Sequence, residues 1–151
     1  MTGRPCSIAA ALQIIGERWA LLAIREITFG NHRFDEIARN TGASRDILTA
    51  RLRALETAGV LERRVYQERP VRHEYHLTEA GRDLRQVLGA LRSWGDRWLV
   101  DEPPVVVEHS CGHELDVLRS CRHCGDEVRP ADVRLDVRAP GWTLSGPAET
   151  P

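Results

Sequence analysis

Residues 33–64 constrain the fold of this chain more than any other stretch, because two short helical patterns follow each other closely there. The first pattern has its apolar positions at Phe34, Ile37 and Ala38. Gly42 is typical of a helix end, and the hydroxyl of Ser44 can cap the next helix. The second pattern places Leu48, Leu52 and Leu55 on one stripe, and Gly59 would end it. Two short helices joined by a turn of three to four residues predict a helix-turn-helix.

The side of the second helix opposite its leucines carries polar or small side chains. A helix needs such a face to enter the major groove of DNA, where arginine can reach guanine edges or phosphates. The candidates for reading bases and for positioning the helix are Ser44, Arg45, Asp46, Thr49 and Arg53. The alternative interpretation is a solvated face on a helix that is only structural.

Residues 60–77, which follow directly, are predicted to form a β-hairpin. Residues 60–66 and 72–77 resemble strands, and Pro70 belongs in the connecting loop because proline lacks the N–H that a ladder needs. Arg69 and Arg72 are the candidates for contacts with DNA phosphates. A basic hairpin directly after a recognition helix is a wing, although an ordinary hairpin with a charged tip fits the same pattern. The helix-turn-helix and the wing together predict DNA binding.

Helical patterns also flank this central region. Residues 7–16 form the first, with Ser7 as its expected cap, and residues 19–28 form the second. Thr78 caps a last helix of about five turns, which carries two tryptophans on one apolar face. We expect such a face to pack against a second subunit, and packing in the core is the alternative. The residues of this helix predicted at a dimer interface are Leu91, Trp94 and Trp98.

Charge is distributed unevenly, which matters more here than the net charge of −1. Residues 1–100 contain 16 arginines against 12 acidic residues, whereas residues 101–151 contain 5 against 10. The basic part thus coincides with the predicted DNA-binding region. An apolar content of 42% permits a core and argues against wholesale disorder. The sequence has no apolar run of membrane-spanning length and no secretory signal, so we expect a cytoplasmic protein with no membrane partner.

Residues 6–99 resemble the HxlR-type transcriptional regulators. The resemblance rests on CSIAAALQIIGERWALLAIREITFG, on RFDEIARNTGASRDILTARLRALETAGVLERRVY and on RPVRHEYHLTEAGRDLRQVLGALRSWGDRW, in register. It implies a mainly α winged helix-turn-helix with a small β-hairpin wing. It also implies a homodimer, joined through the first and last helices, that binds a pseudo-palindromic operator in double-stranded DNA. On the first helix, this places Ile8 and Leu12 at the predicted dimer interface.

The function predicted from these observations is that of a DNA-binding transcriptional regulator, a repressor rather than an activator, and not an enzyme. One alternative is a protein–protein adaptor whose winged helix no longer binds DNA. Another is a small redox enzyme that uses Cys121 and Cys124, although no substrate domain is visible. The sequence does not identify the operator or the effector.

Pro103 and Pro104 mark a linker, which predicts a winged-helix domain at residues 1–101, a small β-rich extension at 105–137 and a flexible tail at 138–151. The extension holds three cysteines, and Zn²⁺ prefers four such soft or borderline ligands in a tetrahedron. The predicted ligands of a structural zinc ion are Cys111, His113, Cys121 and Cys124. His109 and Glu108 are the other candidates for the fourth position. A redox pair or three inert thiols would fit the same spacing.

Cys6 precedes the first helix, where free backbone N–H groups favour a thiolate, and Arg4 is two residues away. A thiolate there could react with quinones, aldehydes or oxidants, which makes Cys6 the candidate sensing residue for an electrophile or another small-molecule effector. The resemblance implies such sensing for some members of the family. A small apolar residue at the dimer interface is the alternative.

Overall fold

The computed structural model describes residues 4–148, and contacts divide the chain into two compact units. One unit comprises residues 6–100, and the other comprises residues 1–5 together with residues 101–151. Each unit is described by itself.

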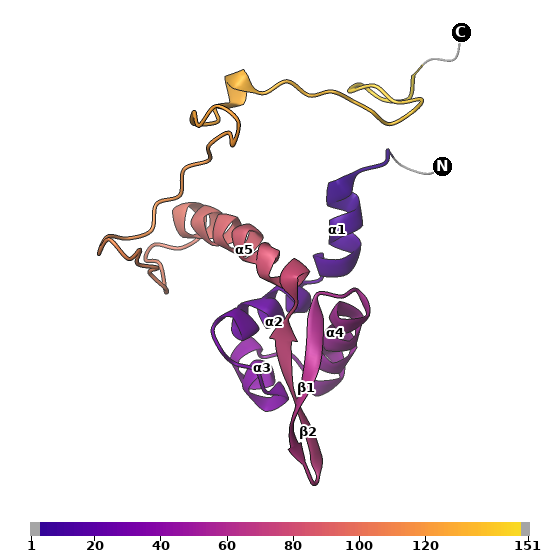
Figure 1. Ribbon diagram of the computed structural model, residues 1–151, viewed down its shortest axis with the longest axis vertical. Coiled ribbons are helices and arrows are strands. Elements are labelled where there is room, and N and C mark those ends of the chain that lie inside the picture. The colour runs from indigo at the N-terminus through magenta and orange to yellow at the C-terminus, as the bar shows by residue number, and fades with distance from the viewer. Residues whose placement is uncertain (1–3, 149–151) are drawn as a thin grey trace. The chain divides into compact units, whose positions relative to one another are not determined.

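The first unit contains five helices and one hairpin (Figure 1). In chain order they are α1 (Ser7–Ile15), α2 (Arg18–Thr28), α3 (Phe34–Thr41), α4 (Arg45–Thr57), β1 (Leu61–Glu68), β2 (Val71–Leu77) and α5 (Glu79–Trp98). Helices α3 and α4 form the predicted helix-turn-helix, joined by residues 42–44, and β1 and β2 pair antiparallel as the predicted wing. The predicted fold class, mainly α with a β-hairpin wing, is therefore confirmed.

The core lies between α2, α3, α4 and the base of the hairpin. The predicted leucine stripe of α4 is fully buried, which confirms the helical period. The buried apolar residues are Ile15, Ala20, Ala23, Ile24, Ile27, Ile37, Ala43, Leu48, Leu52, Leu55, Val60, Leu61 and Leu77. This cluster holds α4 by one side only and leaves its other side at the surface.

Two of the three expected helix caps are confirmed. The Ser44 hydroxyl accepts a hydrogen bond from the Ile47 N–H, and the Thr78 hydroxyl accepts one from the Gly81 N–H. The prediction that Ser7 caps the first helix is wrong, because Ser7 is already helical and Cys6 occupies the capping position without a side-chain bond. The backbone of Cys6 is extended, so α1 begins at the next residue although the Cys6 side chain makes no capping hydrogen bond.

The hairpin closes more tightly than the sequence predicts. Its strands extend to Glu68 and from Val71, so that only Arg69 and Pro70 form the turn, with Pro70 outside the ladder as expected. The register shifts between Val65 and Gln67, which leaves Tyr66 as a bulge.

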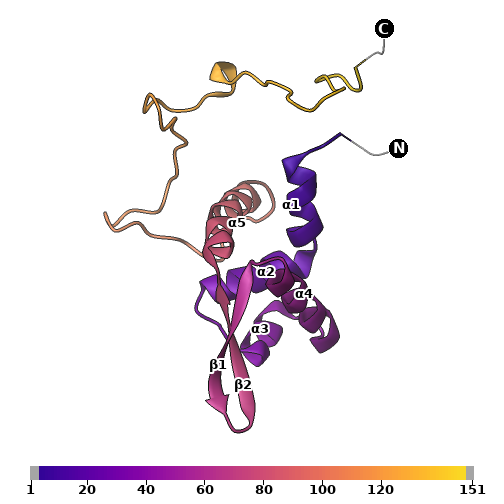
Figure 2. The ribbon, with the colours of Figure 1, turned by 45° about the vertical axis from the view of Figure 1, so that its right-hand side comes forward.

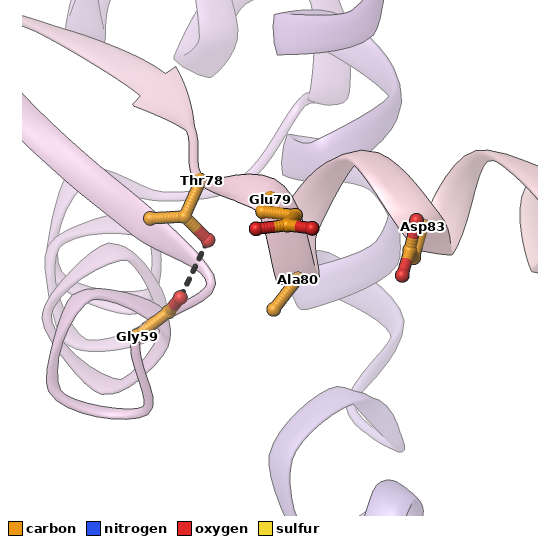
Figure 3. A pocket seen from close by; sticks show the side chains of 5 residues that line it. All are labelled: Gly59, Thr78, Glu79, Ala80 and Asp83. Atoms are coloured by element: carbon orange, nitrogen blue, oxygen red, sulfur yellow. Dashed lines mark hydrogen bonds between the residues drawn. The ribbon is translucent and has the colours of Figure 1, made fainter.

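Helix α5 starts directly at the hairpin, and its start contacts the short connection between α4 and β1 (Figure 3). The Thr78 hydroxyl donates a hydrogen bond of 2.6 Å to the Gly59 carbonyl. Gly81 is buried, and a Cβ atom there would lie 2.2 Å from the Val60 carbonyl oxygen. The open hollow beside this junction has a volume of about 460 Å³, and it is lined by Gly59, Thr78, Glu79, Ala80 and Asp83.

The described part of the C-terminal extension contains local turns and one 3-10 helix, η1 (Pro130–Asp132). Its β-structure consists of three isolated bridges, at Glu108–Glu114, Ser120–Glu127 and Trp142–Pro147. None of residues 101–148 is buried. The predicted boundaries at 105–137 and 138–151 stay predictions, and residues 149–151 of the expected flexible tail lie outside the described residues.

Within residues 4–148, no single helix has the length and hydropathy needed to cross a membrane. Helices α1 and α2 reach that threshold only as a pair, and the chain bends by 77° between them.

Candidate nucleic-acid interface

The outer face of α4 presents the side chains that the sequence assigned to DNA. Ser44, Arg45, Asp46 and Arg53 are exposed, and Thr49 is half-buried. Asp46, Thr49 and Arg53 face away from the buried leucines. Arg45 lies at the edge of this face, and Ser44 precedes the helix as its cap. Ile47 is exposed beside them and was missed in the sequence, where it reads as one more apolar position.

The two arginines of this face differ in their partners. Arg45 donates to the Asp35 carboxylate at 2.7 Å, and its guanidinium lies 4.8 Å from the centre of the Phe34 ring. Both partners are in the first turn of α3, so Arg45 is held against the start of that helix. Arg53 has no hydrogen bond or ion pair within the described residues, which leaves its guanidinium available for a base edge.

The wing also contains arginines with and without a carboxylate partner. At its tip, Arg69 and Arg72 are exposed, and neither side chain pairs with another group of residues 4–148. Farther down β1, Arg63 donates to Glu56 at 2.8 Å and Arg64 pairs with Glu62. The hydrogen bond to Glu56 also raises the pKa of the Arg63 guanidinium above its ordinary value. Unneutralised positive charge in the wing is therefore concentrated at the tip, where phosphate contacts were predicted.

A short third segment ties the wing to the helix-turn-helix. The His32 carbonyl accepts a hydrogen bond of 2.8 Å from the Tyr75 N–H. Arg33 bridges to Glu74, with 3.4 Å between Nε and Oε1, and lies 4.6 Å from the centre of the Tyr66 ring. These contacts fix the wing relative to the start of α3. No sequence pattern indicates them, since they join positions about 40 residues apart.

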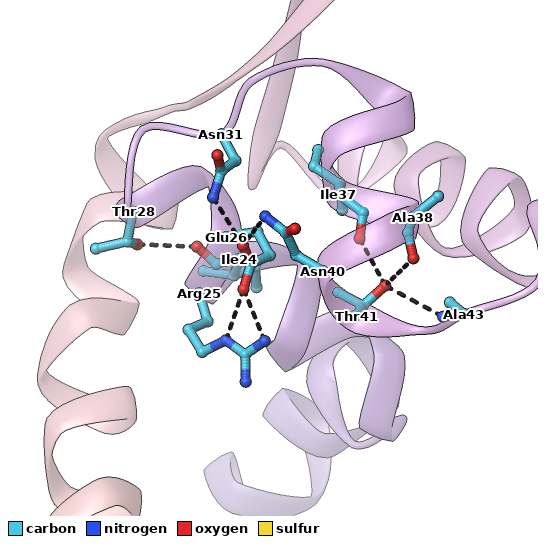
Figure 4. Close-up of polar contacts among 10 residues, drawn as sticks. All are labelled: Ile24, Arg25, Glu26, Thr28, Asn31, Ile37, Ala38, Asn40, Thr41 and Ala43. Atoms are coloured by element: carbon cyan, nitrogen blue, oxygen red, sulfur yellow. Dashed lines mark hydrogen bonds and ion pairs between the residues drawn. The ribbon is translucent and has the colours of Figure 1, made fainter. Parts of the chain in front are cut away.

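A buried carboxylate positions α3 against α2 (Figure 4). Glu26 is only 4% exposed, and Arg25 donates to its Oε1 atom through two guanidinium nitrogens. Its Oε2 atom accepts from Asn31 at 2.8 Å and from Asn40 at 2.9 Å. A fully satisfied buried charge makes the packing specific, because every partner must be in place. The only sequence signal was an acidic residue within the apolar run of α2.

Apolar side chains stay uncovered on α1 and α5. Ile8 is 70% exposed, Trp94 56% and Trp98 63%, and Leu12 and Leu91 are exposed as well. Figures 1 and 2 show both helices at the end of the unit opposite the tip of the wing. All five residues predicted at a dimer interface are therefore at the surface of a single chain.

The cysteines all carry free thiols. Cys6 is exposed at the start of α1, whereas the Arg4 guanidinium donates to the Leu144 carbonyl at 2.9 Å within the second unit. Backbone N–H groups of Cys124 and His123, together with the Cys124 side chain, lower the pKa of the Cys121 thiol.

The residues predicted to bind zinc are not gathered at one point. No group of three or more Cys, His, Asp or Glu side chains within residues 4–148 is close enough to hold a metal ion. Cys121 and Cys124 lie in one turn of the extension, and Cys111 and His113 lie in another. The metal site thus stays a prediction.

Comparison with known proteins matches the chain to a family of helix-turn-helix regulators. The model of the family described as HxlR-like helix-turn-helix matches residues 14–103. The uncharacterized HTH-type transcriptional regulator Rv3095 of Mycobacterium tuberculosis is 45% identical over 130 residues, which cover 84% of this chain and 82% of the relative. The family model ends at residue 103, and a match of 130 residues must continue beyond that point. The similarity to this relative therefore includes part of the extension.

Solved structures with the same fold include two of particular interest. The crystal structure of PA1607, named as a transcription factor, has a TM-score of 0.77 at 34% identity and covers 87% of this chain and 94% of its own. The redox regulator HypR in its oxidized form has a TM-score of 0.54 at 34% identity and covers 61% of this chain and 96% of its own.

Proposed function

The chain belongs to the HxlR-like helix-turn-helix family and is a DNA-binding transcriptional regulator, and from that premise we propose that it represses transcription as a homodimer on a pseudo-palindromic operator. The observation that carries the proposal is the pattern of unpaired arginines. Arg53 on α4 and Arg69 and Arg72 at the wing tip carry charge that no described side chain neutralises. By contrast, Arg45 at the start of α4 and Arg63 and Arg64 in β1 are paired with carboxylates.

The arginines of this surface take different roles in the proposed complex. Arg53 reads a base edge in the major groove, because the outer face of α4 presents its guanidinium without a partner. Arg45, with Asp35 beside it, positions the helix, since a contact with DNA must compete with the existing ion pair. Arg69 and Arg72 contact the phosphate backbone and supply affinity without sequence preference.

The dimer is proposed to form through α1 and α5. Large apolar side chains on both helices are exposed in one chain, and exposed apolar side chains of this size are typical of a protein interface. Two-fold symmetry would present two copies of α4 to successive major grooves. The centres of the half-sites should then be about 10 base pairs apart, or a multiple of that spacing.

Two measurements test this function. Footprinting on the intergenic DNA next to the gene should protect a two-fold symmetric site, and a gel shift should show the same fragment bound. Sedimentation should give a dimer for the wild type and for Leu118→Glu, which alters an exposed apolar residue of the extension. The double variant Trp94→Glu, Trp98→Glu should sediment as a monomer. A wild type that binds no DNA would instead support an adaptor that acts through protein contacts.

A response to electrophiles through Cys6 is the second candidate function. Its support is the exposure of this thiol at the first turn of α1, a helix of the proposed dimer interface, together with a relative named as a redox regulator. A group added to Cys6 would displace α1 and change the spacing of the two recognition helices.

Treatment with diamide or a quinone, followed by mapping of adducts by mass spectrometry, tests the role of Cys6. We expect Cys6 to be modified and the treated protein to release DNA, whereas Cys6→Ser should stay bound. Cys121 is the competitor, because its turn already favours the thiolate. If Cys6→Ser still releases DNA on treatment, the signal acts at another cysteine.

A further inference from the structure

Two tight turns organise the middle of the C-terminal extension. The first is closed by the Glu108–Glu114 bridge and by a hydrogen bond of 2.7 Å from the Leu115 N–H to the Val107 carbonyl. Inside it, the His109 N–H donates to the His113 carbonyl at 2.8 Å. The Gly112 N–H donates back to the His109 carbonyl at 2.9 Å.

The second turn repeats this arrangement. It is closed by the Ser120–Glu127 bridge and by a bond of 2.8 Å from the Val128 N–H to the Arg119 carbonyl. The Cys121 N–H donates to the Asp126 carbonyl at 2.8 Å. The Gly125 N–H donates back to the Cys121 carbonyl at 2.7 Å.

The hydrogen bonds define which positions correspond. His109 and Cys121 each follow the closing bridge and accept from the glycine of the turn. Both glycines have positive φ angles, +83° at Gly112 and +81° at Gly125, and a cysteine precedes each of them. The backbone thus pairs His109 with Cys121 and Cys111 with Cys124, although the first turn is one residue shorter.

One side-chain contact also involves a leading residue. In the first turn, Nδ1 of His109 accepts from the backbone N–H of Cys111 at 3.3 Å. The lone pair of His109 therefore points into the loop that carries Cys111. His113 instead corresponds to Asp126, and Glu108 corresponds to Ser120.

The extension has no core that could hold the two turns together. Val117 and Leu118, which lie between the turns, are both 71% exposed, and no described residue of the extension is buried. Short segments that cannot bury enough apolar surface commonly depend on a metal ion or a disulfide for their order.

We propose that the two turns are the halves of one structural zinc site with His109, Cys111, Cys121 and Cys124 as ligands. Three thiolates and one imidazole form a closed tetrahedral set that suits Zn²⁺. His109 replaces His113 as the nitrogen ligand, because its position matches that of the leading cysteine. Metal binding replaces the hydrogen bond to the imidazole, brings the turns together and orders the extension.

The test compares two histidine variants of the full-length chain. Zinc content after purification without chelator should be about one per chain for the wild type and for the matched control His113→Gln. His109→Gln should weaken Zn²⁺ binding at least ~10-fold, as measured by competition with a chelating dye, since even loss of an outer-shell partner costs about that much. Cys121→Ser should lose the ion while the helical circular dichroism of the winged-helix unit stays unchanged.

Substitution with Co²⁺ gives an independent readout. The wild type and His113→Gln should share one visible spectrum of tetrahedral cobalt–thiolate coordination, and His109→Gln should shift it. Zinc affinity that His109→Gln leaves unchanged, or that His113→Gln reduces instead, would overturn the assignment. A wild type that binds no zinc after loading with Zn²⁺ would overturn the site itself.

Discussion

Residues 6–100 and the described residues of the extension, 101–148, differ in what can hold them together. All buried apolar side chains of residues 4–148 lie between Ile15 and Leu77, and the extension has only local turns and bridges. The first unit is stabilised by one cluster of buried apolar side chains that several helices share. Each turn of the extension is stabilised only by its own backbone hydrogen bonds. Substitutions of similar chemistry should therefore have very different effects in the two units.

The largest expected difference is between two Leu→Ala substitutions. Leu52 is 1% exposed, so Leu52→Ala should reduce the free energy of unfolding by ~2–5 kcal/mol through lost burial and a cavity. Leu118, which is 71% exposed, is the matched control, and Leu118→Ala should change it by less than about 0.5 kcal/mol. Urea unfolding followed by circular dichroism measures both. Equal losses would show that the extension belongs to the core.

A glycine pair tests the junction between α5 and the hairpin. Gly81→Ala should destabilise by ~1–3 kcal/mol, because its Cβ would lie 2.2 Å from the Val60 carbonyl oxygen. Gly89 lies in the same helix, and a Cβ atom there would meet nothing within 4 Å beyond the helix's own backbone. Gly89→Ala should therefore stabilise by about 0.5–1 kcal/mol. Thermal unfolding of the two variants should shift in opposite directions. A shift of Gly81→Ala to higher temperature would mean that the close approach at Gly81 relaxes freely.

The smallest expected effect concerns an exposed ion pair of the winged-helix unit. Arg45 and Asp35 are both largely exposed, so Arg45→Ala should cost only ~0.2–1 kcal/mol of stability. That loss should shrink further at high salt, because solvent ions screen exposed charges. Urea unfolding at low and high ionic strength measures it. A loss as large as that of Leu52→Ala would mean that surface contacts, rather than burial, hold α3 and α4 together.

The sequence predicted the parts of the fold that depend on local pattern. The leucines of α4, the caps at Ser44 and Thr78, and the position of Pro70 outside the ladder all follow from period or residue type. The exposed face of α4 could be predicted for the same reason, because burying one stripe leaves the opposite side at the surface.

The contacts that join distant segments could not be predicted. Glu26 is stabilised by Asn31 and Asn40, and Arg33 reaches Tyr66 and Glu74, but no local pattern connects these positions. The choice between His109 and His113 in the extension depends on which amide bonds to which carbonyl. Residue type alone does not determine that pairing, so the sequence predicts His113 as the ligand and leaves His109 only as an alternative.

Operator binding by three arginine variants, measured over a range of salt concentrations, tests the proposed DNA-binding surface most directly. Arg69→Ala should weaken binding to all sequences alike and lower the salt slope by about 1 per monomer, and Arg53→Ala should cost ~1–3 kcal/mol and relax one base position. Arg64→Ala is the matched control, because Glu62 already neutralises that guanidinium, and it should leave the affinity nearly unchanged. Unchanged affinity in both Arg53→Ala and Arg69→Ala would contradict that surface.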